Sequence, residues 1–196
     1  MRPLAPVSAG ARIVLGAGFF VLFIALWAAV TYGGLVPPLF LASPGKTVAA
    51  GFALFTEYNF LRDIGVTVFR VVGGFLIAAA IAVPLGLAMG AFKAVEAFLE
   101  PFVSFARYLP ASAFIPLLIL WAGVGEAQKL SVIFIGSVFQ IVIMVAVTAG
   151  ATRMDLVEAA TTLGAQRGGI VARVIVPAAA PQIAETLRLV LGWAWT

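Results

Sequence analysis

Three stretches of this sequence run for about twenty residues each without a charged side chain, and they cover Ile13–Tyr32, Val71–Phe92 and Leu130–Ala151. A helix rises about 1.5 Å per residue, so about twenty apolar residues match the ~30 Å hydrocarbon core of a bilayer. The chain is 63% hydrophobic and 10% charged, whereas soluble domains are about 25% charged. These features predict an all-α integral membrane protein.

The sequence contains neither cysteine nor histidine. Disulfides, catalytic thiols and the usual zinc or haem ligands are therefore excluded within the chain, and we expect no metal site and no cofactor. The formal net charge is +4. The basic residues sit at the ends of the apolar runs, which indicates membrane orientation rather than nucleic-acid binding.

The first expected span is Ile13–Tyr32, preceded by a cytoplasmic N-terminus at residues 1–12. A signal peptide is the alternative, but the run is too long for one and no small-residue cleavage site follows. A periplasmic loop and a short interfacial helix, about Lys46–Tyr58, complete residues 13–60. Ser43 and Pro44 are expected to begin that helix, with the serine hydroxyl as its cap.

The second span is expected over about Ile64–Phe92. Pro84 predicts a kink, while Gly86 and Gly90 would let another helix approach the backbone closely. Arg70 lies about two turns into the span, where it would either reach the headgroups or face protein.

A third span is expected over about Phe105–Trp121, after an interfacial connection at Lys93–Arg107. Pro110 and Pro116 interrupt it, and interrupted backbone is tolerated at membrane depth where it faces protein or a cavity. Pro110, Ser112 and Pro116 are therefore candidates for lining a pathway, with a simple packing kink as the alternative.

The fourth span is expected over about Leu130–Ala151, followed by a polar interval at residues 153–182 and a fifth apolar stretch at Ile183–Thr196. That last stretch would rise only about 21 Å as a helix, which is too short to cross. The chain is therefore expected to be truncated at its C-terminus, with about five spans present. Glu185 and Arg188, one turn apart near its start, are expected to pair with each other.

The charge distribution predicts which side each loop occupies. With the N-terminus inside, the expected inner segments hold Arg2, Arg12, Lys93, Arg107, Arg153, Arg167 and Arg173. The outer segments hold Lys46, Arg62, Arg70 and Lys129. The excess of basic residues on the inner side follows the positive-inside rule and places the interval 153–182 in the cytoplasm.

A motif occupies this interval: Glu158-Ala159-Ala160, three residues, Gly164, nine residues, and then Val174-Ile-Val176-Pro177. We expect Asp155 to cap a helix whose first turn contains Glu158, because carboxylates are favourable at the positive end of the helix dipole. Ala159, Ala160 and Leu163 would form a small apolar face, and Gly164 would end the helix. A second helix, about Gln166–Val176, would be stopped by Pro177.

This spacing resembles the "EAA" signature of permeases from binding-protein-dependent ABC importers, although valine stands at positions 174 and 176 where the family usually has isoleucine and leucine. The expected coupling residues are Glu158, Ala159, Ala160, Leu163, Gly164, Ala165, Val174 and Pro177. An ordinary amphipathic loop between spans is the alternative.

The resemblance extends over nearly the whole chain and is greatest to permeases of the nitrate, alkanesulfonate and taurine type. The further segments that carry it are Leu41–Pro44, Val66–Phe75, Pro84–Leu87 and Leu109–Gly125. It implies a type I importer permease of six helices, the sixth lying beyond Thr196. In this family the residue that matches Glu158 docks, with its helix, into an ATPase subunit.

The resemblance also implies the partners and the location. They are a second permease copy, two cytoplasmic ATPase subunits and a periplasmic or lipid-anchored solute-binding protein, assembled at the bacterial inner membrane. The expected cargo is a small anion or sulfonate-like solute such as nitrate, an alkanesulfonate or taurine. On this interpretation residues 61–196 form the permease core, and ATP is hydrolysed on another chain.

Two features of the sequence could suggest catalysis, but neither fits a catalytic site. Ser43–Thr47 ends like a phosphate-binding loop, but the first glycine of that motif would fall at Phe40 and no strand precedes it. Glu96 and Glu100 flank Pro101 at a membrane edge, where solvated charges are expected. No catalytic residue is assigned, and the remaining alternatives are an ion-gradient-driven transporter or a non-catalytic membrane scaffold. The former usually carries ionisable groups near the midplane, which the charge-free runs lack.

Overall fold

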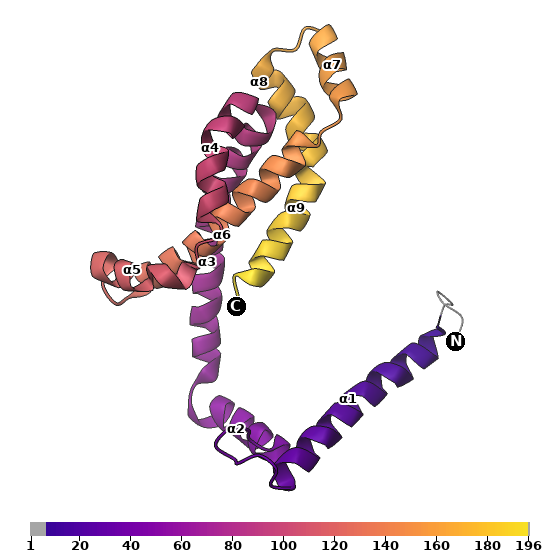
Figure 1. Cartoon of the computed structure of the whole chain (residues 1–196), viewed down its shortest axis with the longest axis vertical. Coiled ribbons are helices and arrows are strands. Elements are labelled where there is room, and N and C mark those ends of the chain that lie inside the picture. The colour runs from indigo at the N-terminus through magenta and orange to yellow at the C-terminus, as the bar shows by residue number, and fades with distance from the viewer. Residues whose placement is uncertain (1–6, 196) are drawn as a thin grey trace. The chain divides into compact units, whose positions relative to one another are not determined.

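The computed structural model describes residues 7–195, and these contain helices, turns and loops but no strand. Arg2 and the rest of residues 1–6 of the expected cytoplasmic N-terminus, together with Thr196, lie outside the described residues. The elements, drawn in Figure 1, are α1 (Ala9–Tyr32), α2 (Pro44–Glu57), α3 (Phe60–Ala91), α4 (Lys93–Ala106), η1 (Ala111–Phe114), α5 (Ile115–Ala122), α6 (Glu126–Gly150), α7 (Met154–Thr162), α8 (Arg167–Ile170), the π-helical turn η2 (Val171–Ile175) and α9 (Val176–Trp193).

Four helical segments are long and apolar enough to cross a membrane, and the bent pair α4 and α5 could supply a fifth. The expected all-helical membrane protein with about five spans is therefore confirmed. The chain divides into two compact units, residues 1–64 and 65–196.

In the first unit, α1 begins where the Ser8 hydroxyl accepts a hydrogen bond from the Ala11 N–H. The loop after α1 is held by the Trp27 Nε1–H, which donates to the Ala42 carbonyl over 3.0 Å. The expected interfacial helix is present as α2, but Ser43 makes no side-chain cap bond. Its carbonyl instead accepts from the Thr47 N–H, so the predicted hydroxyl cap is wrong. None of the residues of α1, Ala9–Tyr32, is buried.

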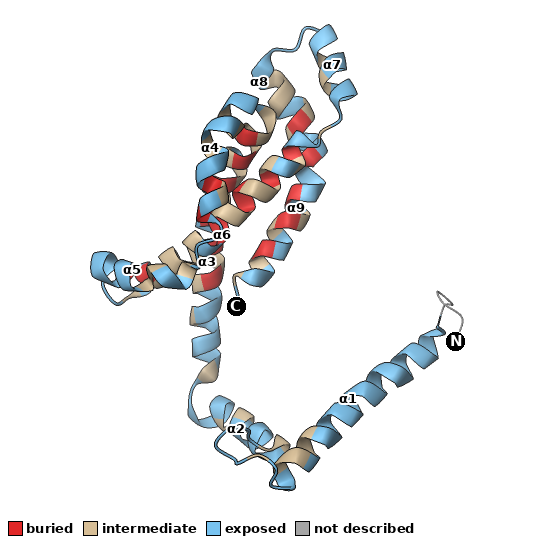
Figure 2. Ribbon diagram, in the orientation of Figure 1, coloured by how far each residue is buried: buried red, intermediate tan, exposed pale blue. Residues whose placement is uncertain are grey.

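The second unit packs α3, α4, α6 and α9 side by side (Figure 1). The buried residues face one another between these helices (Figure 2). The side chains at the centre of this core are Ala78, Ala82, Ile141, Val142, Val145 and Val190. Small side chains on α3 meet branched ones on α6, so the helices can lie close together with few voids.

The closest approach in this unit runs along glycines of α3. A Cβ atom on Gly86 would lie 2.7 Å from the Val142 carbonyl oxygen, and one on Gly90 would lie closer still to the Ala146 carbonyl oxygen. Such distances leave room for a hydrogen atom only, so the backbones of α3 and α6 are in direct contact. The predicted glycine contact is confirmed, and α3 continues through Pro84.

Arg70 is paired with a carboxylate of the protein. Its Nε and Nη2 atoms donate to the two carboxylate oxygens of Glu126 over 2.5 and 2.6 Å. Lys129 adds a longer contact of 3.4 Å to the same carboxylate. This group joins α3 to the first turn of α6. Glu185 and Arg188 also pair as expected, with Nε to Oε2 at 3.0 Å.

The third span is not a continuous helix over Phe105–Trp121. Lys93–Ala106, expected as a connection, is the regular helix α4, and the segment Ala111–Ala122, which comprises η1 and α5, leaves it at an angle of 83°. The break falls before Pro110, because proline disfavours helical backbone at the preceding residue. Pro116 does not interrupt a helix but lies in the first turn of α5, where its missing N–H costs nothing.

Pro177 does not end the helix that contains it. Residues Arg167–Trp193 form one helical segment of 27 residues, because the turn before the proline is widened into a π-helix. The Val176 N–H reaches back to the Val171 carbonyl, five residues earlier. The expectation that the last stretch is only fourteen residues long, and too short to cross, is therefore wrong.

Candidate functional site

The signature residues lie mainly on α7 and the turn after it, at the end of the second unit where α6 and α9 meet (Figure 1). Arg153, not Asp155, is the N-cap residue of α7, and it makes no side-chain cap bond. Asp155 lies in the first turn and forms an ion pair with Arg153. The predicted Asp155 cap is wrong, because this arginine, two residues earlier, binds the carboxylate.

Gly164 ends α7 as expected, in a left-handed conformation with φ of +81°. The Ala165 N–H donates to the Ala160 carbonyl over 3.0 Å, and the Gly164 N–H donates to the Thr161 carbonyl over 2.9 Å. This pair of bonds is a Schellman motif, which satisfies carbonyls that would otherwise be left open at the helix end. The turn thus fixes where α7 stops.

Glu158 is exposed on α7, and its carboxylate forms no hydrogen bond or ion pair with any described residue. The two threonines after it bond within the helix instead: Thr161 Oγ1 donates to the Val157 carbonyl and Thr162 Oγ1 to the Glu158 carbonyl. These hydroxyls are therefore occupied locally, whereas the Glu158 carboxylate is available to a partner.

The expected apolar face is largely open. Leu163 is 89% exposed and Met154 67% exposed, while Ala159 is exposed and Ala160 half-buried. Exposed large apolar side chains beside an unpaired carboxylate are typical of a protein-binding surface. Glu158, Ala159, Leu163, Gly164 and Ala165 are all exposed on this short segment.

Val174 and Pro177 belong to a different part of the structure. Val174 is half-buried in η2, and Pro177 is exposed in the first turn of α9. The turn η2, which contains Val174, contacts α7, whereas Pro177 lies beyond it in α9. They are not on the exposed surface with Glu158.

A hollow that the motif does not indicate lies next to α7. It has a volume of about 500 Å³ and is lined by the end of α6, the start of α7 and α9, including Thr152, Leu156 and Gln182. Thr152 Oγ1 is buried there without a hydrogen-bond partner among the described residues. The sequence holds no signal for it, because its walls come from segments distant in the chain.

The candidate pathway residues lie on the segment that follows the break after α4. Pro110 is the N-cap residue of η1, Ser112 lies within η1, and Pro116 begins α5. All three are exposed. The break therefore places them on an open surface of the second unit and not within its core.

The segment that resembles a phosphate-binding loop belongs to the first unit and forms a helix start. Ser43–Thr47 forms the start of α2, with Pro44 in its first turn. Among residues 7–195, no group of three or more acidic side chains gathers in a way that could hold a metal ion.

Replacing Gly164 with alanine should loosen the end of α7. No atom obstructs a Cβ there, so the effect comes from the left-handed backbone, which costs about 1–2 kcal/mol for a residue with a side chain. We expect amide hydrogen exchange at Gly164 and Ala165 to speed up about tenfold. Asparagine, which tolerates this conformation, is the control, and equal exchange in the two variants would contradict the assignment.

The helices define a polytopic α-helical membrane protein with an exposed helix between its last two spans. Residues 82–196 match the family described as binding-protein-dependent transport system inner membrane component, and the chain belongs to this family. The prediction of an ABC transporter permease, a transport subunit rather than an enzyme, is confirmed at the level of the family.

Three proteins that are similar to this chain are named as permeases. A putative ABC transporter permease protein of Methanocaldococcus jannaschii is 38% identical over 130 residues, or 66% of this chain and 49% of its own. A taurine transport system permease protein of Escherichia coli is 27% identical over 190 residues, 94% of this chain and 69% of its own. A putative aliphatic sulfonates transport permease protein of Bacillus subtilis is 30% identical over 172 residues, 88% of this chain and 62% of its own. The chain thus spans about half to two thirds of these relatives.

Proposed function

We propose that this chain is the membrane-spanning permease of an ATP-driven importer and that α7 is the element through which an ATPase subunit acts on it. The observation that carries the proposal is the exposed, unpaired Glu158 on a short helix that also exposes Met154, has the exposed Leu163 as its C-cap and is fixed at its end by Gly164. A short helix with one unpaired carboxylate and exposed apolar side chains suits a groove on a partner protein.

The continuous helix after α7 supports this proposal. Because Arg167–Trp193 is one helical segment, a displacement of α7 and α8 would be passed directly into a membrane span. The widened turn η2 is the point on this route where the helix geometry is irregular. We infer that closure of two ATPase subunits would move the spans through this connection.

The proposed cargo is a small anionic solute of the sulfonate type, delivered by a periplasmic or lipid-anchored solute-binding protein. The names of the relatives from Escherichia coli and Bacillus subtilis, which refer to taurine and aliphatic sulfonates, support this class. Two copies of the chain would enclose the pathway in a bacterial inner membrane, with Pro110, Ser112 and Pro116 along it. Their exposed position after the broken helix fits that role.

Co-purification tests the proposal directly. The chain, tagged and extracted in mild detergent from its native host, is expected to retain an ABC ATPase subunit in stoichiometric amount. The physical reason is that exposed apolar and charged groups on α7 would be covered in the complex. Transport by the chain in liposomes without any ATPase, driven by an ion gradient, would instead favour a secondary transporter.

A further inference from the structure

Helix α9 carries an ion pair inside a segment that is long and apolar enough to cross a membrane. Glu185 and Arg188 both lie in the candidate span Arg167–Trp193. The preceding charged residue, Arg173, comes twelve residues before Glu185, which is about 18 Å along a helix. That distance exceeds half of the ~30 Å hydrocarbon core of a bilayer. A long uncharged stretch therefore separates the pair from the charges at the α7 end.

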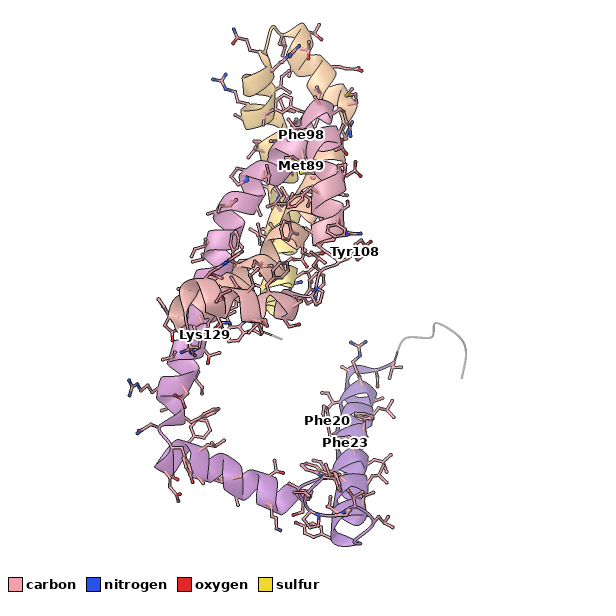
Figure 3. All side chains as sticks on the ribbon, turned by 60° about the vertical axis from the view of Figure 1, so that its left-hand side comes forward. Phe20, Phe23, Met89, Phe98, Tyr108 and Lys129 are labelled. Carbon is pink, nitrogen blue, oxygen red and sulfur yellow. The ribbon has the colours of Figure 1, made fainter. Side chains whose placement is uncertain are left out.

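The packing of α9 on α6 gives the depth of the ion pair. In Figures 1 and 3, α9 runs beside α6 from the α7 end of the second unit towards the level of Lys129. Gln182 lines the hollow next to α7 together with Thr148, which lies near the C-terminal end of α6. The ion pair follows one to two turns further along α9, so it lies beside the charge-free run Leu130–Ala151. This position is within the membrane-spanning part of the second unit.

The ion pair faces away from the core of its own chain. The residues that form the buried side of α9 are Ala179, Ile183, Thr186 and Val190. Arg188 lies two residues after one of these and two before another, which places it on the opposite side of the helix. Its side chain is 73% exposed, and that of Glu185 is 45% exposed. Contact between an ion pair and lipid tails is costly, so this side of α9 must face water or protein.

Polar groups connect the ion pair to the hollow next to α7. Gln182, in the wall of the hollow, precedes Glu185 by three residues, so the two side chains are neighbours on the surface of α9. The hollow also contains the Thr152 hydroxyl, which is buried without a hydrogen-bond partner among the described residues. The volume of about 500 Å³ holds many water molecules, each of which occupies about 30 Å³ in the liquid. These features favour a hydrated route from the hollow to the pair.

Arg188 retains hydrogen-bond donors for a ligand. Its Nε atom donates to Glu185 Oε2 over 3.0 Å, and its Nη2 atom donates to Oε1 over 2.5 Å. A guanidinium carries further N–H groups, and no other described residue accepts a hydrogen bond from them. A small anion can therefore bind the guanidinium while the pair stays intact. The neighbouring Glu185 carboxylate would repel that anion and so limit how tightly it is held.

We propose that Arg188 binds the transported anion within the membrane and that Glu185 is the resident counterion that permits its release. The inference rests on the proposed import function and adds to it a binding site on α9, connected to the hollow next to α7. Without solute, Glu185 offsets the charge of Arg188, so the pair is stable at membrane depth. With solute, two negative charges share one guanidinium, and the weak binding that results allows the solute to leave.

Breaking the pair from its two sides should change anion binding in opposite directions. Binding of ethanesulfonate to the purified complete transporter is measured without ATP and without the solute-binding protein. Glu185→Gln should tighten binding about tenfold because a repelling charge is lost, whereas Arg188→Gln should weaken it at least about tenfold. The Glu185→Gln transporter should also release the anion more slowly and import it at a lower maximal rate.

Two further variants separate this role from a structural one. Glu96→Gln breaks another ion pair between residues three apart, Lys93–Glu96, and should leave ethanesulfonate binding unchanged. Arg188→Lys keeps the positive charge and should bind the anion more tightly than Arg188→Gln does. The melting temperature of each variant is recorded, so that a loss of binding through unfolding is recognised.

The absence of cysteine from the chain allows an independent test of the hydrated side of α9. Gln182 and Ala180 are both exposed and lie two residues apart, so they face nearly opposite sides of the helix at a similar depth. A membrane-impermeant maleimide applied to open membrane sheets should label Gln182→Cys at least about tenfold faster than Ala180→Cys. The reason is that position 182, unlike position 180, lines the hollow.

The proposal is overturned if Glu185→Gln and Arg188→Gln change binding and melting temperature alike. Such a result would show a structural pair, either within α9 or against a second copy of the chain. Equal labelling at positions 180 and 182 would also overturn it. ATPase co-purification is measured on the same membranes. Its loss with the opposite binding effects intact would count against the import function alone, whereas retained ATPase without those effects would count against the anion site alone.

Discussion

Replacing Gly90 with leucine should leave almost no folded protein in the membrane. A Cβ atom at this position meets the Ala146 carbonyl oxygen and lies 2.6 Å from the Ala149 Cβ atom, so even one carbon requires α3 and α6 to separate. Backbone atoms cannot rotate out of the way as a flexible side chain can. We expect the free energy of unfolding to fall by at least about 3 kcal/mol, at the upper end of overpacking effects.

The measurement is thermal unfolding in detergent, in which size-exclusion chromatography reports the fraction of folded protein that remains after heating. Gly65→Leu is the matched control, since Gly65 lies on the same helix with no atom near its Cβ position. It should melt close to the parent protein. Similar melting of the Gly90 and Gly65 variants would contradict the close contact between α3 and α6.

Reversing the charge at position 158 should abolish transport without unfolding the chain. Glu158 is exposed and bonded to nothing within the described residues, so Glu158→Lys costs the isolated chain little. In the proposed complex, the substitution would place a lysine where the ATPase binds the Glu158 carboxylate. Loss of one buried charge pair weakens binding by about 2–5 kcal/mol. The affinity for the ATPase should therefore fall at least about thirtyfold.

Uptake of labelled solute and ATPase pull-down check this result together. Glu57→Lys, an exposed charge reversal on α2, should leave both unchanged. If the Glu158→Lys transporter imports at the parent rate and keeps its ATPase, the coupling role of α7 is wrong.

The spans free of charge were predictable from sequence because the signal is local. Ile13–Tyr32 and Leu130–Ala151 are mostly apolar and carry no charge along their whole length, so hydropathy alone identifies them as spans. α4 could not be recognised in this way. Glu96, Glu100 and Ser104 lie on one face of α4, and a count along the sequence averages that face with the apolar side that packs on the core.

Two of the wrong predictions at helix ends have a common cause. Pro177 was expected to stop a helix, but the π-helical turn before it moves the Val176 N–H to a carbonyl five residues back. Asp155 was expected to cap α7, but Arg153 binds its carboxylate instead. Both expectations follow from general preferences of single residues, and both were overridden by the particular geometry of the neighbouring turn.

The candidate site likewise has one part that the sequence predicts and another part that only the packing of the helices reveals. Glu158 to Gly164 are close in the chain, so their spacing already indicates a helix ended by a glycine turn. A second hollow, beside α4, depends on Met89 and Ile143 as well as on Glu100, and these come from three helices. Only the packing of α3 and α6 against α4 brings these residues to one hollow.

The direct backbone contact between α3 and α6 also provides a fixed reference distance for spectroscopy. At Gly86 and Gly90 the backbones of the two helices are in direct contact, so they cannot come closer together, and the close packing around them resists their separation. Spin labels placed on the outer surfaces of this pair would keep a constant separation through a transport cycle. Distances from that pair to α5 or α7 would then measure motion on a fixed scale, in a chain whose lack of native cysteine keeps the labelling background low.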